Sequence, residues 1–88
     1  MTTATASIQN KTVIHARPAS VFVQTAAKFK SKVEIEANGK KVDAKSILMI
    51  MSLGLAKGTD VKLIADGPDE EEAVKTLKEL IDSKFGEE

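Results

Sequence analysis

Several residue types on which common protein functions depend are missing or rare in this chain of 88 residues. It contains no cysteine, which excludes a disulfide framework, a thiolate nucleophile and a cysteine-based zinc or iron–sulfur site. Tryptophan and tyrosine are absent, and three phenylalanines do not make an aromatic platform on which nucleic-acid bases could stack. There is one histidine, so a two-histidine metal site is excluded, and we expect no metal and no cofactor.

Long hydrophobic runs are also lacking. The longest, residues 47–51, is far shorter than the ~20 apolar residues that span a bilayer. The start of the chain, residues 1–5, is polar and rich in threonine, without the basic and apolar regions of a signal peptide. We therefore expect a cytoplasmic protein with no membrane insertion.

What the chain does contain is typical of a small globular protein. Hydrophobic residues make up 42% of it, and 13 lysines and arginines balance 13 aspartates and glutamates. The length predicts a single domain over residues 1–88. Residues 1–45 carry a net charge of +5 and residues 66–88 a net charge of −6. This asymmetry either steers an acidic partner or a phosphorylated ligand toward the N-terminal half, or reflects two solvated surfaces.

The spacing of apolar residues predicts the order strand, helix, strand, strand, helix, strand, helix (βαββαβα). In chain order, the elements are a strand at 2–9, a helical stripe from Pro18 to Phe29, strands on either side of Asn38-Gly39, a helix at 47–53, a strand at 60–66 and a helix that ends near Phe85-Gly86. We expect an α+β open-faced β-sandwich, in which three helices cover one face of a four-stranded antiparallel sheet.

Turn and cap residues support these boundaries. Asn38-Gly39 is a strong hairpin signal, and a two-residue turn there pairs Ile35 with Val42 on the buried face. Ser46 is a natural N-cap for the helix at 47–53, which Gly54 can close in a left-handed conformation. Asp69, followed three residues later by Glu72, predicts a capping box at the start of the last helix.

The start of the first helix is a candidate anion site. His15 and Arg17 precede Pro18, and no Ser, Thr, Asp or Asn stands next to the helix start, so the N–H groups of Ala16 and Arg17 lack an evident side-chain acceptor. A helix start without a side-chain cap and next to an arginine favours the binding of an anion. An imidazole with an unperturbed pKa of about 6.5 is partly a neutral nucleophile, and a phosphoryl group on its ring would lie near these donors. The residues alone leave open that His15 only ends a strand and that water satisfies the helix.

The segment His15-Ala16-Arg17-Pro18-Ala19-Ser20 resembles the active-site signature of the HPr family. These are the histidine-containing phosphocarrier proteins of the bacterial phosphoenolpyruvate-dependent sugar phosphotransferase system. The resemblance covers essentially the whole chain and continues at residues 23–26, 44–47, 51–54 and 66–67. It implies that His15 accepts a phosphoryl group from enzyme I on Nδ1 and passes it to the IIA components of sugar permeases. Arg17 would steady the transferring charge, and the chain would be a phosphohistidine carrier that turns over no small molecule itself.

The resemblance also implies a regulatory site and a docking surface. Ser46 matches a serine phosphorylated by HPr kinase/phosphorylase, which would make catabolite control protein a further partner; a plain N-cap is the competing role. A helix as short as 47–53 cannot bury apolar residues on all sides, and an exposed apolar patch marks an interface. The residues expected to dock partners are Ile47, Leu48, Met49 and Met51. We expect a monomer.

Two departures and two alternatives accompany this interpretation. The family generally has glycine at the position of Val13, and the loss of that glycine stiffens the loop before His15. Low-GC members of the family often have Met-Gly where this chain has Leu48-Met49. One alternative is a regulatory module that acts through Ser46 and the helix at 47–53 without productive histidine transfer, although such paralogues lack the histidine. The other is nucleic-acid binding by the basic half, which the lack of aromatic residues disfavours.

Overall fold

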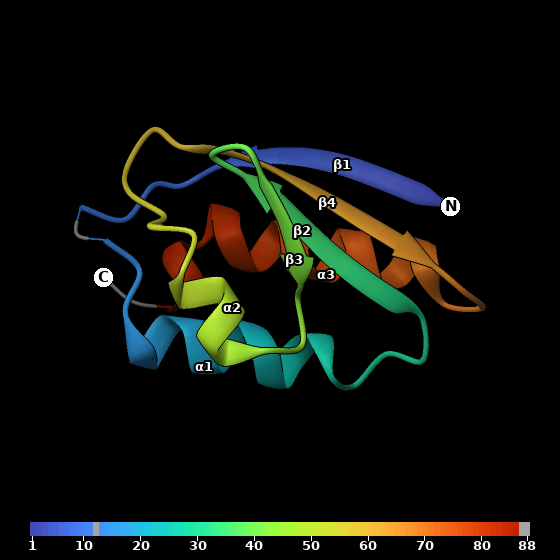
Figure 1. Ribbon diagram of the computed structural model, residues 1–88. Helices are drawn as coiled ribbons and strands as arrows, with labels where there is room; N and C mark the ends of the chain where they lie inside the picture. The colour runs from blue at the N-terminus through green and yellow to red at the C-terminus, as the bar shows by residue number, and fades with distance from the viewer. Residues whose placement is uncertain (12, 87–88) are drawn as a thin grey trace.

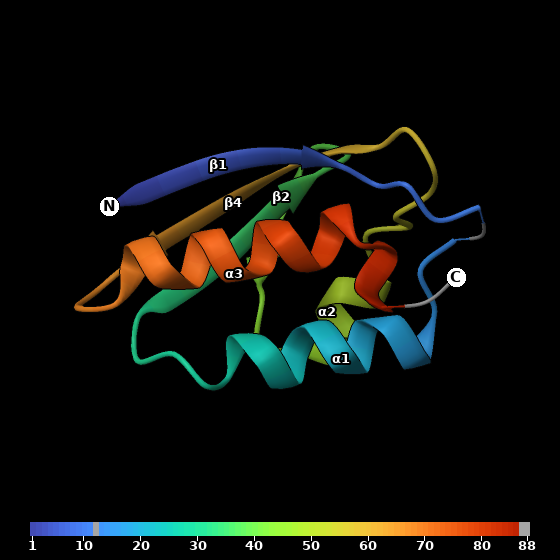
Figure 2. The same ribbon diagram turned by 180° about the vertical axis from the view of Figure 1, so that it is seen from behind.

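The structure, a computed structural model, describes residues 1–11 and 13–86, and within these ranges the chain forms four strands, three α-helices and a short 3₁₀ turn. The elements are β1 (Thr2–Ser7), α1 (Ala16–Ala26), β2 (Lys32–Ala37), β3 (Lys40–Asp43), α2 (Ile47–Met51), β4 (Asp60–Asp66), α3 (Glu70–Asp82) and the turn at Lys84–Gly86. The strands form one antiparallel sheet in the order β1-β4-β2-β3. The helices lie on one face of the sheet and leave the other open (Figure 1, Figure 2). This confirms the predicted α+β open-faced sandwich.

The β2–β3 hairpin has the predicted register because its two turn residues adopt left-handed conformations. Asn38 has φ 53° and Gly39 has φ 81°, values that fit a two-residue turn between right-twisted strands. Ile35 pairs with Val42 as expected, and both side chains are buried.

Some predicted boundaries are wrong. β1 ends at Ser7 rather than at residue 9, and α2 ends at Met51 rather than at residue 53. The helix that was expected to reach Phe29 ends at Ala26. Phe29 nevertheless packs against the core, because the chain folds back after α1 before it enters β2. Apolar spacing therefore identified a residue that packs against the core although its backbone is not helical.

The helical layer consists of unequal pieces. α1 has 11 residues, α2 has 5 and α3 has 13. Both α2 and α3 pack against α1, which forms the lower edge of the molecule in Figure 2. Across residues 1–11 and 13–86, none of the helices has the length and apolar character needed to cross a membrane.

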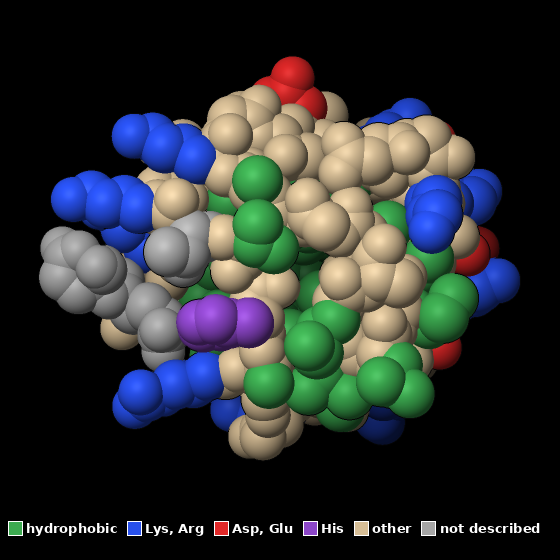
Figure 3. Space-filling view, turned by 60° about the vertical axis from the view of Figure 1, so that its left-hand side comes forward, with side chains coloured by type: hydrophobic (Ala, Val, Ile, Leu, Met, Phe, Trp, Pro, Cys, Tyr) green, Lys and Arg blue, Asp and Glu red, His purple; other side chains and the backbone are tan. Residues whose placement is uncertain are grey.

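The core fills the space between the sheet and the helices. Its largest fully buried apolar side chains are Ile8, Phe22, Val33, Ile35, Ile50, Leu55, Val61, Leu63, Leu77 and Ile81. Other large apolar side chains remain exposed: Met1, Val13, Val21, Leu48, Met49 and Met51. Figure 3 shows a face of the molecule on which hydrophobic side chains (green) gather beside the histidine (purple). Exposed apolar patches on soluble proteins often mark sites of interaction with a partner.

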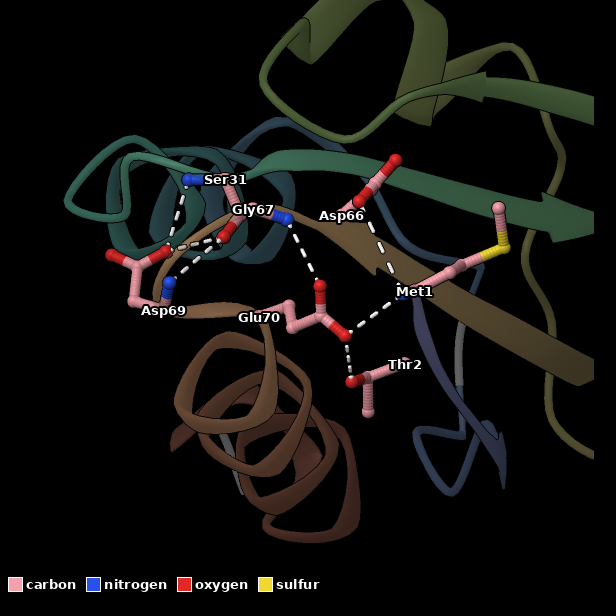
Figure 4. Close-up of polar contacts among 7 residues, drawn as sticks. All are labelled: Met1, Thr2, Ser31, Asp66, Gly67, Asp69 and Glu70. Atoms are coloured by element: carbon pink, nitrogen blue, oxygen red, sulfur yellow. Dashed lines mark hydrogen bonds and ion pairs between the residues drawn. The ribbon is translucent and has the colours of Figure 1, made fainter.

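The capping box predicted at the start of α3 is not formed. Asp69 stands at the N-cap position, but its side chain makes no capping hydrogen bond, and Glu72 is exposed. The Asp69 carboxylate instead accepts hydrogen bonds from the backbone N–H groups of Lys30 and Ser31 (both 2.9 Å) and from the Ser31 hydroxyl. Figure 4 shows the contacts between Asp69 and Ser31. The residue expected to act as a cap thus connects α3 to the segment between α1 and β2.

Glu70, and not Glu72, is the acidic residue of the first turn of α3 whose side chain accepts a hydrogen bond from the backbone before the helix. One oxygen of its carboxylate accepts from the Gly67 N–H (3.0 Å), and the other accepts from the Thr2 hydroxyl and lies 3.0 Å from the N-terminal ammonium of Met1 (Figure 4). Gly67 is needed here because a Cβ would lie 2.6 Å from the Cα of Ser31. Glu70 and Gly67 thereby join β1 to the β4–α3 turn.

Lowering the pH is expected to destabilise the fold through these two carboxylates. The hydroxyl of Ser31 and backbone N–H groups lower the pKa of Asp69 from 3.8 to about 2, and the hydroxyl of Thr2 with the Gly67 N–H lowers the pKa of Glu70 from 4.5 to about 2. Because the folded pKa values lie below the unfolded ones, their stabilisation is complete above about pH 5 and is lost as the pH falls toward 2. Urea unfolding as a function of pH measures this loss.

Asp69→Asn removes one of the two titrating groups and should flatten the acid limb of that stability profile. Glu79→Gln, at an exposed position on α3, is the matched control and should leave the limb as steep as in the parent. An equally steep profile in Asp69→Asn would show that other carboxylates govern acid unfolding.

Candidate functional site

His15 occupies the N-cap position of α1 with an extended backbone (φ −114°, ψ −162°). Its carbonyl accepts the N–H of Ala19 (3.0 Å) and so begins the helix, but its side chain makes no capping hydrogen bond and is exposed. The imidazole has no structural task at the helix start. It is therefore accessible to a reaction partner from solvent.

The segment before His15 is anchored by Ile14. The Ile14 side chain is buried, and its N–H donates to the Leu55 carbonyl (2.7 Å). Val13 and His15 on either side are exposed, as expected for an extended segment whose side chains alternate. Val13, where the family generally has glycine, places an exposed apolar side chain beside His15.

The first turn of α1 favours an anion near His15. It contains no acidic residue, and Pro18, which has no N–H, is buried in it. Ala16 and Arg17 are exposed on the same turn. The positive end of the helix dipole stabilises negative charge at the helix start, and Arg17 adds a positively charged side chain to the same turn.

Ser46 forms the N-cap that the sequence predicted. Its hydroxyl accepts the Met49 N–H at 3.5 Å, and its carbonyl accepts the Ile50 N–H at 3.0 Å. A feature that the sequence did not indicate lies next to it: Lys45 Nζ donates to the carbonyls of Phe29 (2.9 Å) and Ser31 (3.0 Å). These two hydrogen bonds connect the residue before the α2 N-cap to the segment between α1 and β2.

The predicted docking residues divide into two groups. Leu48, Met49 and Met51 are exposed, with Leu48 the most exposed at 76%. Ile47 is half-buried and packs against the core, so its larger role is structural. Val21 of α1 is also exposed, although it was not among the predicted docking residues. Since α1 and α2 pack together, the apolar surface of α2 lies beside the helix that His15 begins.

The fold and this site define a class: small open-faced α+β sandwiches that present an exposed histidine at the start of a helix. The family model described as "PTS HPr component phosphorylation site" matches residues 2–83. The chain belongs to the HPr family, and its general role is that of a phosphocarrier of the phosphotransferase system.

Solved structures agree with this assignment. HPr-C-His from Thermoanaerobacter tengcongensis is 60% identical with a TM-score of 0.93, and the match covers 100% of this chain and 99% of that one. Phosphocarrier protein HPr from Bacillus anthracis str. Ames is 38% identical with a TM-score of 0.86, over 91% and 95% of the two chains. Crh, the catabolite repression protein of Bacillus subtilis, is 45% identical with a TM-score of 0.76, over 96% and 97%. Crh was solved as a dimer with a swapped domain, so the expectation of a monomer draws no support from that relative.

Proposed function

We propose that this chain accepts a phosphoryl group from enzyme I on Nδ1 of His15 and passes it to the IIA components of sugar permeases in the cytoplasm. The observation that carries the proposal is the exposed His15 imidazole, which makes no capping bond, at a helix start with no acidic residue. Membership of the HPr family supports it.

The chemistry follows from the properties of imidazole. The neutral ring attacks phosphorus with the Nδ1 lone pair, the Nδ1–P bond forms, and the bond from phosphorus to the donor breaks with its electron pair leaving on the donor. The transferring group is negatively charged, and Arg17 with the N–H groups of Ala16 and Arg17 would stabilise that charge. A nucleophile of the IIA component then attacks phosphorus, and the Nδ1–P bond breaks with its electron pair returning to Nδ1. No small molecule is turned over by the chain itself.

Incubation with phosphoenolpyruvate and enzyme I tests the proposal. Intact mass spectrometry should show the gain of one phosphate that is stable in base and lost in acid, as expected for a phosphorus–nitrogen bond. A further incubation with a IIA component should remove that phosphate. A chain that gains no phosphate from enzyme I would refute the carrier function.

We further propose that Ser46 is a regulatory phosphorylation site for HPr kinase/phosphorylase, with catabolite control protein as a reader. Ser46 is half-buried at the start of α2, next to the exposed Leu48 and Met49. A phosphate there adds about −1.5 to −2 charge, which the helix start tolerates. Its consequence is a change in the surface that partners meet.

Ser46→Asp is expected to slow phosphorylation of His15 by enzyme I by about threefold at low salt. The added negative charge opposes the attraction between an acidic partner and the basic N-terminal half of the chain. The effect should appear as weaker association and shrink as salt is raised. Ser46→Ala is the control: it loses a cap bond, about 1 kcal/mol, but should accept phosphate at His15 almost as fast as the parent. Equal rates for Ser46→Asp and the parent at low salt would leave Ser46 as a helix cap only.

A second candidate is a regulatory module that acts through Ser46 and α2 without productive histidine transfer. The similarity to Crh, a catabolite repression protein, favours it. The presence of an exposed His15 favours the carrier. Phosphate uptake at Ser46 from the kinase, together with none at His15 from enzyme I, would select the regulatory module.

A further inference from the structure

The chain beyond α3 turns back in a strained conformation. Lys84, Phe85 and Gly86 have φ values of 61°, 60° and 73°, so three successive residues are left-handed and two of them are not glycine. Such a backbone persists where its surroundings hold it in place. Phe85 is buried, and its ring packs edge to face on Phe22 of α1 with the centroids 6.0 Å apart. We call residues 84–86 the C-terminal hook.

The hook also contacts the loop that leads to His15. Asn10 lies in the connection between β1 and α1, of which residues 8–11 and 13–14 are described, and its side chain is only 9% exposed. Its Nδ2 donates to the carbonyl of Lys84 (3.0 Å). The same hook therefore touches the loop before His15 through Asn10 and the helix after His15 through Phe22.

Stability alone does not account for an asparagine at this position. Its Oδ1 is buried, and no donor in residues 1–11 and 13–86 forms a hydrogen bond to it. A buried acceptor left unpaired is unfavourable, and a small apolar side chain would avoid that cost. What Asn10 contributes is the directional bond to Lys84, which an apolar residue cannot make.

Backbone bonds hold the two ends of this loop, and Asn10 holds its middle. At the first end, Ile8 donates to the Thr59 carbonyl and accepts from the Gly58 N–H, both at 2.9 Å. At the other end, the Ile14 N–H donates to Leu55 (2.7 Å). Between these points the Asn10 side chain connects the loop to the hook.

We propose that Asn10 is a positioning residue for phosphoryl transfer at His15, acting by clamping the loop before the histidine to the C-terminal hook. The inference rests on the proposed function. With this hydrogen bond in place, the loop before His15 and the helix α1 after it both contact the C-terminal hook, so the direction of the imidazole is constrained. Without it the loop moves relative to α1, and a smaller fraction of molecules presents the ring in the orientation that the transfer requires.

Asn10→Ala and a matched control, Ser31→Ala, test the clamp. Ser31 is also buried, but its hydroxyl is fully engaged, donating to the Asp69 carboxylate and accepting the Asp69 N–H (3.2 Å), and it follows the opposite end of α1. Ser31→Ala should therefore lower the urea midpoint more than Asn10→Ala does. We expect Asn10→Ala to lower kcat for phosphorylation by enzyme I about three- to tenfold, with KM unchanged because the docking residues are untouched. Ser31→Ala should leave both constants as in the parent.

Amide hydrogen exchange of the unphosphorylated chain provides a readout that does not depend on transfer. The Ile14 amide should exchange faster in Asn10→Ala than in the parent and be unchanged in Ser31→Ala. A parent chain that gains no phosphate overturns the proposed function. If the parent is phosphorylated and Asn10→Ala has the same kcat, the positioning role alone is overturned. The same holds if Ser31→Ala slows phosphorylation as much as Asn10→Ala does.

Discussion

Replacing His15 with alanine is expected to abolish phosphate uptake from phosphoenolpyruvate and enzyme I while leaving the fold intact. The imidazole is the proposed nucleophile, and the chain has neither a second histidine nor a cysteine to replace it. Because the side chain is exposed and makes no capping bond, its removal should change the free energy of unfolding by no more than about 0.5 kcal/mol. Intact mass measures the phosphate, and urea unfolding measures the stability.

Ser46→Ala is the control for this experiment, since it removes the other proposed phosphate acceptor. It should keep an acid-labile phosphate, whereas His15→Ala should gain none from enzyme I. Acid treatment separates the two sites because phosphoserine survives it and phosphohistidine does not. An acid-labile phosphate on His15→Ala would place the acceptor at a different residue.

Most of the fold was predictable because it depends on local patterns. Alternation indicated the strands, and the Asn38-Gly39 dipeptide indicated the hairpin register, since few residues adopt the left-handed angles that this turn needs. Ser46 was predictable as a cap because its bond goes to an N–H only three residues away. The candidate site at His15 and Arg17 was also indicated by residues that are contiguous in the chain, which by themselves left open that His15 only ends a strand.

Interactions between distant segments were not predictable from such patterns. Asp69 was expected to cap α3, but its carboxylate binds N–H groups of residues 38 and 39 positions earlier, and nothing in the local sequence signals those partners. Asn10 and Lys84 are likewise 74 positions apart. Phe29 was correctly expected to face the core and wrongly expected to be helical, because burial and backbone conformation are separate properties. Tertiary packing decided each of these cases.

Leu48→Asp is expected to weaken docking of enzyme I by about tenfold or more without unfolding the protein. Leu48 is the most exposed large aliphatic side chain of α2, so the fold does not depend on it. In the proposed interface it contributes apolar contact area beside Met49 and Met51, and a carboxylate there would be buried without a partner. KM for this chain as the substrate of enzyme I measures the loss, and kcat should change little because His15 and Arg17 are untouched.

Thr3→Asp is the matched control, because it adds the same charge at an exposed position of β1. If only net charge mattered, the two variants would raise KM equally. Leu48→Asp should also differ from Ser46→Asp in its response to salt. The electrostatic repulsion introduced by Ser46→Asp is screened as ionic strength rises, whereas the lost apolar contact and the cost of burying a carboxylate at position 48 persist. A KM for Leu48→Asp that returns to the parent value at high salt would show that α2 contacts enzyme I through charge and not through its apolar surface.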